Sequence, residues 1–358
     1  MGEGDGLLVW PPQLLGSGDV DGRGEGRGHG DRDRDRDVAW SEGSGGARPS
    51  EAGALRKVRP ARIGRGEPAV ELGGPTRIIV PLTGADVDEL RAQCQALGGH
   101  PVDLVEWRVD QLAALRGGLG VVGGGACGFG EAGGDGGSAR PVRAGESRDT
   151  VEPVARRSRP GRVLGRTARH AVEEALEVVL GQAGLPVLAT VRTVHEGGAA
   201  DLGDLGYAEL VEWLASGGAH AVDVEYRRAG AASIIENAHR AGTAVIASNH
   251  DFGGTPPEDE VIARLVAMRD LGADVAKVAY RAREPLDMFP VLNAQMWARE
   301  HLGIPVIAIS MGVAGAITRI GGERLGSAAT FATVGRGSAP GQFSAEAVAE
   351  ALRDESRP

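Results

Sequence analysis

From Arg77 onward, short apolar runs alternate with longer amphipathic stretches. Many of the runs are continuous, as in Ile78-Ile79-Val80, which is typical of parallel strands that are covered on both faces. The apolar runs number eight: 77–82, 102–108, 186–192, 221–226, 244–248, 274–280, 304–310 and 328–333. Helical patterns between them include residues 86–97, 171–180, 207–214 and 258–271.

This alternation predicts the fold class. Eight strand–helix units fit an α/β fold of the (β/α)8 or TIM barrel type better than a doubly wound sheet. No Gly-x-Gly-x-x-Gly opens a helix in the way that a dinucleotide site requires, and the sequence has no Walker loop. We therefore predict a catalytic barrel over residues 76–355.

Two segments lack this alternation of strand and helix patterns. Residues 1–75 are Gly-rich and polar and include the charge run from Asp31 to Asp37, so we predict a disordered N-terminal extension. A partner-binding tail and a translation start placed too far upstream are the alternatives. Residues 117–167 form a Gly/Arg-rich insertion after the second strand, and their first 23 residues hold 12 glycines. Because this composition buries almost nothing, we predict disorder there as well.

Charge and composition narrow the possible partners. The net charge of −10 over 358 residues provides no basic field for nucleic acid or anionic lipid. No apolar stretch approaches the ~20 residues that cross a bilayer, and the first residues lack the pattern of a secretory signal. Two cysteines are too few for a disulfide framework, and Cys94 fits a helix as a core residue. We expect a soluble, cytoplasmic protein.

Polar residues gather where the predicted strands end. Catalytic groups of a (β/α)8 barrel come from the carboxyl ends of strands and from the loops after them. The residues at those positions are Glu106-Trp107-Arg108, Arg192, His195-Glu196-Gly197-Gly198, Asp223, Glu225, Ser248-Asn249-His250-Asp251-Phe252, Lys277, Ser310-Met311-Gly312, Arg319 and Ser338-Ala339-Pro340-Gly341-Gln342. The sequence therefore predicts an active site at this face.

Lys277 is the most informative of these residues. It lies inside an apolar strand, between Ala276 and Val278, where an ammonium group is costly to bury without a partner. One interpretation is an ion pair with a carboxylate such as Glu106 or Asp223. The functional interpretation is an amine that desolvation and nearby cations keep neutral, ready to attack a carbonyl.

The remaining candidates suggest an acid–base pair and a substrate. His250 follows the strand next to that of Lys277, its titration range suits proton transfer, and Glu196 could orient it. Arg108, Arg192 and Arg319 would point toward one cavity, and guanidinium groups suit carboxylates and phosphates. Alternatively, some of them merely neutralise Glu106 and Glu196. We expect an anionic carbonyl substrate and neither a metal nor a cofactor.

The set of motifs resembles the type I 3-dehydroquinate dehydratase family. The resemblance rests on Glu106-Trp107-Arg108, Arg192-Thr193-x-x-Glu196-Gly197-Gly198, Ser248-Asn249-His250-Asp251-Phe252, Lys277, Ser310-Met311-Gly312, Arg319 and Ser338-Ala339-Pro340-Gly341-Gln342. It covers residues from about Arg77 to Leu352, apart from the insertion. Single motifs of this kind are weak signals, whereas the whole set in this order at family-like spacing is specific.

The resemblance implies a reaction of the shikimate pathway, from 3-dehydroquinate to 3-dehydroshikimate and water. Lys277 would form a Schiff base with the C3 ketone, and His250, oriented by Glu196, would serve as general acid and base. Arg319 would bind the substrate carboxylate, and Ser338 and Gln342 would lie on a loop that closes over the substrate. Glu106, Arg108 and Arg192 would hold the ring hydroxyls and the polar surroundings. Members of the family are commonly homodimers.

Two rival functions remain at this stage. Another class I Schiff-base enzyme, such as an aldolase, would share a lysine like Lys277, and Gly321-Gly322 and Gly335 could then form a phosphate site. A non-catalytic scaffold protein would instead predict the loss of Lys277, His250 or Arg319, and none of these is lost. The pair of His250 with Glu196 and the late Ser-Ala-Pro-Gly-Gln loop favour the dehydratase.

Overall fold

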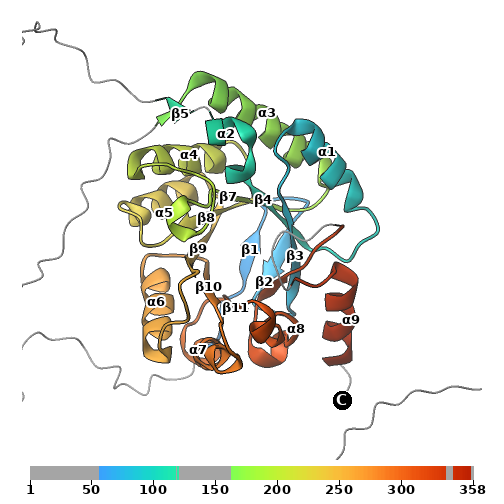
Figure 1. Cartoon of the computed structure of the whole chain (residues 1–358), viewed down its shortest axis with the longest axis vertical. Coiled ribbons are helices and arrows are strands. Elements are labelled where there is room, and N and C mark those ends of the chain that lie inside the picture. Colours follow the sequence, from blue (N-terminus) through green and yellow to red (C-terminus); the bar gives the residue numbers. More distant parts are fainter. Residues whose placement is uncertain (1–55, 118, 121–162, 336–341, 356–358) are drawn as a thin grey trace, which may run out of the picture. The chain divides into compact units, whose positions relative to one another are not determined.

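The computed structural model describes residues 56–117, 119–120, 163–335 and 342–355. Its largest sheet has eight strands in the order β11-β10-β9-β8-β7-β4-β3-β12, each parallel to its neighbours. In chain order they are β3 (Arg77–Leu82), β4 (Leu104–Arg108), β7 (Val187–Thr190), β8 (Ala221–Glu225), β9 (Ala244–Asp251), β10 (Val275–Arg281), β11 (Val306–Met311) and β12 (Ala329–Phe331). Figure 1 shows these strands at the centre, with helices around them.

The two outer strands of this order also approach each other. The amide of Ala328, just before β12, donates to the carbonyl of Val306 on β11 at 2.8 Å. The sheet therefore closes almost completely into a barrel, and each of the eight predicted apolar runs overlaps one of its strands. The predicted (β/α)8 barrel is confirmed.

Helices cover the outside of the barrel. They are α1 (Val87–Ala96), α2 (Ala113–Gly117), α3 (Arg166–Gln182), α4 (Asp204–Ser216), α5 (Ala231–Arg240), α6 (Glu258–Asp270), α7 (Phe289–His301), α8 (Ile317–Ile320) and α9 (Ala345–Glu355). The start of α1 shows how the sequence sets a boundary, because the Asp86 carboxylate accepts from the amide of Glu89 at 2.9 Å and caps the helix. None of the helices in the described ranges is long and apolar enough to cross a membrane.

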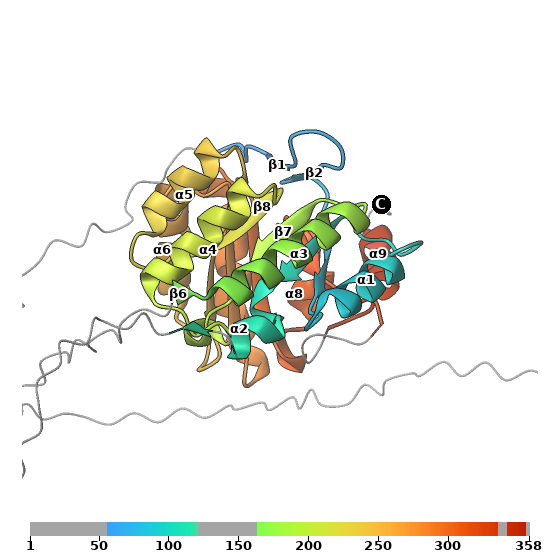
Figure 2. The same cartoon turned by 90° about the horizontal axis from the view of Figure 1, so that it is seen from above.

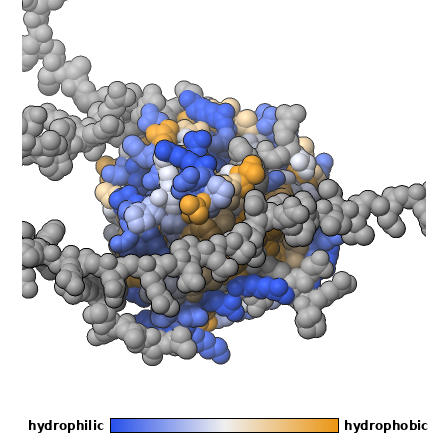
Figure 3. Space-filling view, turned by 60° about the horizontal axis from the view of Figure 1, so that its bottom comes forward, coloured by the Kyte–Doolittle hydropathy of each residue, from blue (hydrophilic) through white to orange (hydrophobic). Residues whose placement is uncertain are grey.

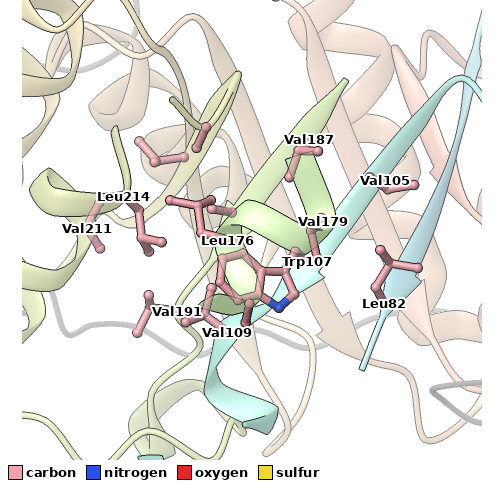
Figure 4. Close-up of a cluster of buried hydrophobic side chains, with 14 of the residues drawn as sticks. Leu82, Val105, Trp107, Val109, Leu176, Val179, Val187, Val191, Val211 and Leu214 are labelled. Atoms are coloured by element: carbon pink, nitrogen blue, oxygen red, sulfur yellow. The ribbon is translucent and has the colours of Figure 1, made fainter. Parts of the chain in front are cut away.

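The main core lies between the strands and these helices. Trp107 points outward from β4 and is completely buried in a cluster that includes Leu176 and Val179 of α3. Figure 4 shows its ring among these side chains and Val109 and Val191. Burial of a large apolar side chain contributes roughly 1.5–3 kcal/mol, so this layer fixes the strands that carry the polar residues. Cys94 is a buried core residue of α1, as predicted.

A two-stranded hairpin closes the amino-terminal end of the barrel. Strands β1 (Ala61–Ile63) and β2 (Val70–Leu72) pair antiparallel. Their inward side chains share one buried cluster with Ile79 and Leu104 of the barrel interior. Figure 2 shows the hairpin at one end of the barrel and α2 and β6 (Val163–Leu164) at the other.

This hairpin corrects the predicted N-terminal boundary. Disorder up to residue 75 is wrong for residues 61–72, because two short alternations, Ala-Arg-Ile and Val-Glu-Leu, place apolar side chains in the core. Such three-residue patterns carry little signal beside Gly-rich neighbours. The insertion also has ordered edges, since β5 (Leu119–Gly120) pairs with β6 and α3 begins at Arg166. Residues 1–55 and 121–162 lie outside the described residues.

Candidate active site

The barrel interior changes from apolar to polar along its axis. Successive strand residues alternate between the interior and the helix layer. On β10 the interior positions are Val275, Lys277 and Ala279. On β8 they include the buried Ala221 and, two residues later, Asp223. The first polar interior layer consists of Glu106, Thr190, Asp223, Ser248 and Lys277. These residues belong to five neighbouring strands, so their side chains meet on the barrel axis.

Lys277 lies in this layer with only 4% of its side chain exposed. Its Nζ is 3.1 Å from Oε1 of Glu106 and 3.4 Å from Oδ2 of Asp223. The same nitrogen is 4.5 Å from the centroid of the Phe331 ring, which supplies a cation–π contact from β12. The ion pairs considered as one interpretation of Lys277 are therefore present, and a functional role must be compatible with them.

Arg192 connects the carboxylates of the site. Its guanidinium is buried and donates to Asp223 at 2.8 Å, Glu196 at 3.2 Å and Glu225 at 3.3 Å. Burial lowers the pKa of Arg192, but the three carboxylates outweigh it and the net shift is upward. The pKa of Asp223 would be raised by burial, but Arg192 and Lys277 keep it below its ordinary value. Arg192 thus neutralises acidic side chains, as the alternative interpretation of the arginines proposed.

A tight turn after β7 places Glu196 over the barrel. The short helix η2 (Val194–Glu196) is followed by Gly197 at φ +77°, and the amide of Gly198 donates back to Thr193 at 2.8 Å. A Cβ on Gly198 would lie 2.0 Å from the carbonyl oxygen of Arg192, and one on Gly197 would overlap the Phe252 ring. Glycine is therefore required at both positions, which explains the Glu-Gly-Gly motif.

Glu196 and His250 form a buried acid–base pair. Oε2 of Glu196 is 3.0 Å from both Nδ1 and the backbone amide of His250. Burial lowers the pKa of His250 well below its ordinary value, and the charges of Arg192, Lys277 and Arg108 act in the same direction. Burial also raises the pKa of Glu196 to about 7, although Arg192 opposes this shift. The contact is therefore a hydrogen bond between a neutral imidazole and a carboxyl group, not an ion pair.

The guanidinium of Arg108 is held by the carboxylate of Asp110. Its Nε and Nη2 donate to the two carboxylate oxygens of Asp110, at 2.8 and 2.9 Å. Burial would raise the pKa of Asp110, but the hydrogen bonds and charge of Arg108 lower it overall. Asp110 also accepts from the amide of Ala199 at 3.0 Å, so this pair ties the end of β4 to the loop that carries Glu196.

Arg319 differs from the other two arginines. It lies in α8 after β11 with 4% of its surface exposed. Within the described part of the chain its guanidinium has no ion pair, and its buried Nε has no hydrogen-bond partner. Burial lowers the pKa of Arg319, and no carboxylate among the described residues raises it again. A buried cation without a partner is costly unless an anion binds to it, so Arg319 is the strongest candidate for an anion-binding residue.

A cleft of about 750 Å³ opens beside the acid–base pair. Its wall includes Glu196, Asn249, His250, Phe252 and Arg264. Lys277 and Arg319 do not line it, so this cleft flanks the polar interior without containing the amine. Within the described ranges, no cluster of three His, Cys, Asp or Glu side chains has the arrangement of a metal site.

Comparison with known proteins identifies the family. The family model of type I 3-dehydroquinase matches residues 164–357. The chain is 32% identical over 283 residues to 3-dehydroquinate dehydratase of Klebsiella pneumoniae, an alignment that covers 78% of this chain and 93% of that protein. The chain belongs to the type I 3-dehydroquinase family. It is therefore an enzyme, a hydro-lyase, and the predicted resemblance is confirmed.

Further relatives in this family agree in sequence and fold. The 3-dehydroquinate dehydratase of Lactiplantibacillus plantarum is 32% identical, with 80% of this chain and 95% of that protein covered. A crystal structure of the type I enzyme of Clostridium difficile, with covalent modified comenic acid, has a TM-score of 0.64 and 25% identity over 83% of this chain and 98% of that one. The enzyme of Geobacillus kaustophilus has a TM-score of 0.63 and 26% identity over 80% of this chain and 95% of that one.

The structure brings together most of the site residues predicted from this resemblance. Lys277, His250, Glu196, Glu106 and Arg192 belong to one connected set of hydrogen bonds and ion pairs. Gln342 is described and half-buried, whereas Ser338 lies outside the described residues. The roles of these residues stay predictions.

Sequence reasoning gave no role to several members of the network. Thr190 donates to Oε1 of Glu106 at 3.1 Å, and Ser248 donates to Oδ1 of Asp223 at 2.5 Å. The signal that could have found them is the strand alternation itself, because both stand at interior positions directly after an apolar residue. Asp110 had no such signal, since it lies in the short helix η1 (Val109–Gln111) after β4.

Proposed function

We propose that this chain dehydrates 3-dehydroquinate to 3-dehydroshikimate through an imine on Lys277. The observation that carries the proposal is a buried amine on β10 beside a strand, β9, that presents a histidine held by a carboxylate. The relative from Clostridium difficile, solved with covalent modified comenic acid, supports covalent chemistry in the family.

The first step is attack of the Lys277 amine on the C3 carbonyl. The amine must first lose a proton, and Glu106, with Oε1 at 3.1 Å, is placed to accept it. Nζ then forms a bond to C3 as the C=O π electrons move to the oxygen. One proton from the nitrogen and the proton returned by Glu106 convert that oxygen to water, and its departure leaves a protonated imine beside an ionised Glu106. Because that imine carries one positive charge, the same two carboxylates that hold the ammonium would stabilise it. The observed ion pairs are therefore compatible with the functional interpretation.

His250 carries out the proton transfers. When the Nδ1–H of His250 donates to Glu196, the lone pair on Nε2 can remove a proton from C2, and the C–H electrons move into the imine to give an enamine. The enamine then expels the C1 hydroxyl, which takes the proton from His250 and leaves as water. Hydrolysis of the remaining imine releases 3-dehydroshikimate and the free lysine. The net change is the loss of one water molecule.

Arg319 would bind the carboxylate of the substrate at C1. We expect Arg319→Met to raise KM about 10- to 100-fold with a smaller change in kcat, since a hydrogen bond to a charged group contributes roughly 1.5–3 kcal/mol. Because the guanidinium lacks a partner in the described residues, its removal should not lower the melting temperature. Steady-state kinetics and thermal unfolding measure both effects. The exposed Arg227, changed to Met, is the control, and an unchanged KM in Arg319→Met would refute the role.

The other substrate-binding roles belong to the same proposal. Glu106 would contact the ring hydroxyls, and Ser338 and Gln342 would close over the bound ligand. Arg108 and Arg192 would shape the polar surroundings, because their guanidinium groups already bind Asp110, Asp223, Glu196 and Glu225. For the whole protein we propose a cytoplasmic homodimer, which light scattering would show as twice the 36.9 kDa chain mass.

Trapping of the imine tests the proposed function. Borohydride reduces an imine and locks the ligand onto the amine, so incubation with 3-dehydroquinate should add one ligand mass to the intact protein. The lysine that carries the trapped ligand can be assigned by mutation, because the chain contains only two lysines, Lys57 and Lys277. Lys57→Ala should still be trapped and Lys277→Ala should not. Folded wild-type protein that neither gains mass nor turns over the substrate would remove the proposal.

A further inference from the structure

Asn249 lies next to His250 in β9 but faces the opposite side of the strand. Its side chain lies between the barrel and α6, where it contacts Arg264 and Tyr280. We infer that Asn249 is a positioning residue, which holds the carboxylate of Glu196 and through it the ring of His250. This inference rests on the proposed function, because it concerns the proton transfers assigned to His250.

The chemistry of its neighbours fixes the orientation of the Asn249 amide. Oδ1 accepts from Nη1 of Arg264 at 2.7 Å and from the Tyr280 hydroxyl at 3.1 Å. Nδ2 donates to Oε1 of Glu196 at 3.0 Å. A flipped amide would set its NH2 group against two donors and its oxygen against a carboxylate, so one orientation satisfies every group.

The two ends of the Glu196 carboxylate have separate partners. Oε2 is shared by the ring and amide of His250 and by Arg192, whereas Oε1 receives its hydrogen bond from Asn249. Without the Asn249 donor, the carboxylate keeps its contacts at one oxygen only and can turn about that end. A turn of this kind would move the acceptor of His250 Nδ1 and with it the ring that faces the substrate.

Arg264 is itself held in place. It donates to Asn249, lies over the Tyr280 ring with its guanidinium carbon 5.3 Å from the centroid, and contacts Glu260 one turn away on α6. The chain of contacts therefore runs from the helix layer through Asn249 to the barrel interior. Asn249 and Arg264 also line the cleft that flanks Glu196.

Other charged groups surround the pair and must stay constant in a test. Arg192, Glu225 and Asp223 act on Glu196, and Arg192, Lys277 and Arg108 act on His250. The hydrogen bond from Asn249 lowers the pKa of Glu196, so its removal should raise that pKa. Loss of the donor thus shifts the acidic limb of the rate profile to higher pH. If the Glu196 carboxylate and the His250 ring lose their positions, kcat falls even at pH values where Glu196 is fully ionised.

Two substitutions test the hydrogen bond from Asn249, and in each the plateau rate reports the positioning effect and the acidic limb reports the pKa effect. Asn249→Asp keeps an acceptor for Arg264 and Tyr280 but removes the donor to Glu196, and Asn249→Leu removes both. For each we expect kcat at the alkaline plateau to fall about tenfold, KM to stay within about twofold, and the acidic limb to move to higher pH. Borohydride trapping on Lys277 should persist in both, because the amine is untouched.

Val261→Ala is the matched structural control. It removes buried methyl groups from α6, the helix of Arg264, without touching a hydrogen bond of the network. It should lower the melting temperature and leave the pH profile of kcat unchanged. A plateau kcat equal to wild type in folded Asn249→Asp would overturn the inference, as would a rise in KM in place of the fall in kcat. Wild-type protein without turnover or trapping would instead overturn the proposed function, and this inference with it.

Discussion

Replacement of Lys277 by Ala or Arg is expected to reduce kcat by more than about 10⁴-fold, the largest effect of any single substitution in this chain. Neither side chain can form the imine, and without that electron sink the C2 proton is far less acidic. Lys277→Arg retains a cation beside Glu106 and Asp223, so it separates the loss of the nucleophile from the loss of the ion pairs.

The measurement is the ultraviolet absorbance of the conjugated enone product, followed at saturating 3-dehydroquinate. Lys57→Ala is the matched control, because Lys57 is exposed and is the chain's only other lysine. Circular dichroism should confirm that both Lys277 variants are folded. Substantial turnover by folded Lys277→Arg would contradict the covalent mechanism and leave Lys277 with only its ion-pair role.

The barrel could be predicted from the sequence because its apolar runs alternate regularly with helical patterns. A run such as Val306-Ile307-Ala308-Ile309 is typical of a strand covered on both faces. The hairpin β1–β2 could not be predicted, since its core contacts come from four apolar side chains on two three-residue strands. Its stability comes from the barrel end that it covers, and a local pattern does not contain that information.

The positions of the main active-site residues could be predicted from the sequence, but their hydrogen-bond and ion-pair partners could not. A lysine within an apolar strand and a histidine at the end of its neighbour indicate the chemistry by their positions alone. The guanidinium of Arg192, in contrast, contacts Asp223, Glu225 and Glu196 together, which depends on the pairing of β7 with β8 and on one turn. Asn249 was part of a quoted motif, but its role depends on Arg264 and Tyr280, which approach from the helix layer.

The charge balance of the barrel interior supports both halves of the mechanism. Arg192 and Lys277 face Glu106, Asp223 and Glu225, so the interior layer is not cationic overall. The protonated imine of the proposed mechanism would therefore be stabilised at Lys277. His250 lies above this layer and is buried near three cations, which keeps it neutral and available as a base. In the proposed mechanism the imine nitrogen and the acid–base residue therefore lie at different levels of the barrel axis.

The second large effect is expected at His250. His250→Ala should lower kcat by about 10²- to 10⁴-fold, the usual contribution of general acid–base catalysis. Because Lys277 is retained, this variant should still be trapped by borohydride, whereas Lys277→Ala should not. His170→Ala is the matched control, since His170 is exposed on α3 and does not line the candidate cleft, and it should keep the wild-type rate.

The pH profile of this variant tests how the pair works. In the wild type the pKa of Glu196 is raised to about 7, so its carboxylate form is present above that pH and is lost below it. A protonated Glu196 would donate to Nδ1 of His250, which places the ring proton on Nε2 and removes the lone pair that accepts the C2 proton. Wild-type kcat should therefore fall as the pH drops through about 7, with an apparent pKa that belongs to the pair. The residual rate of His250→Ala should lack this limb, and a limb retained in that variant would assign the titration to a group other than the Glu196–His250 pair.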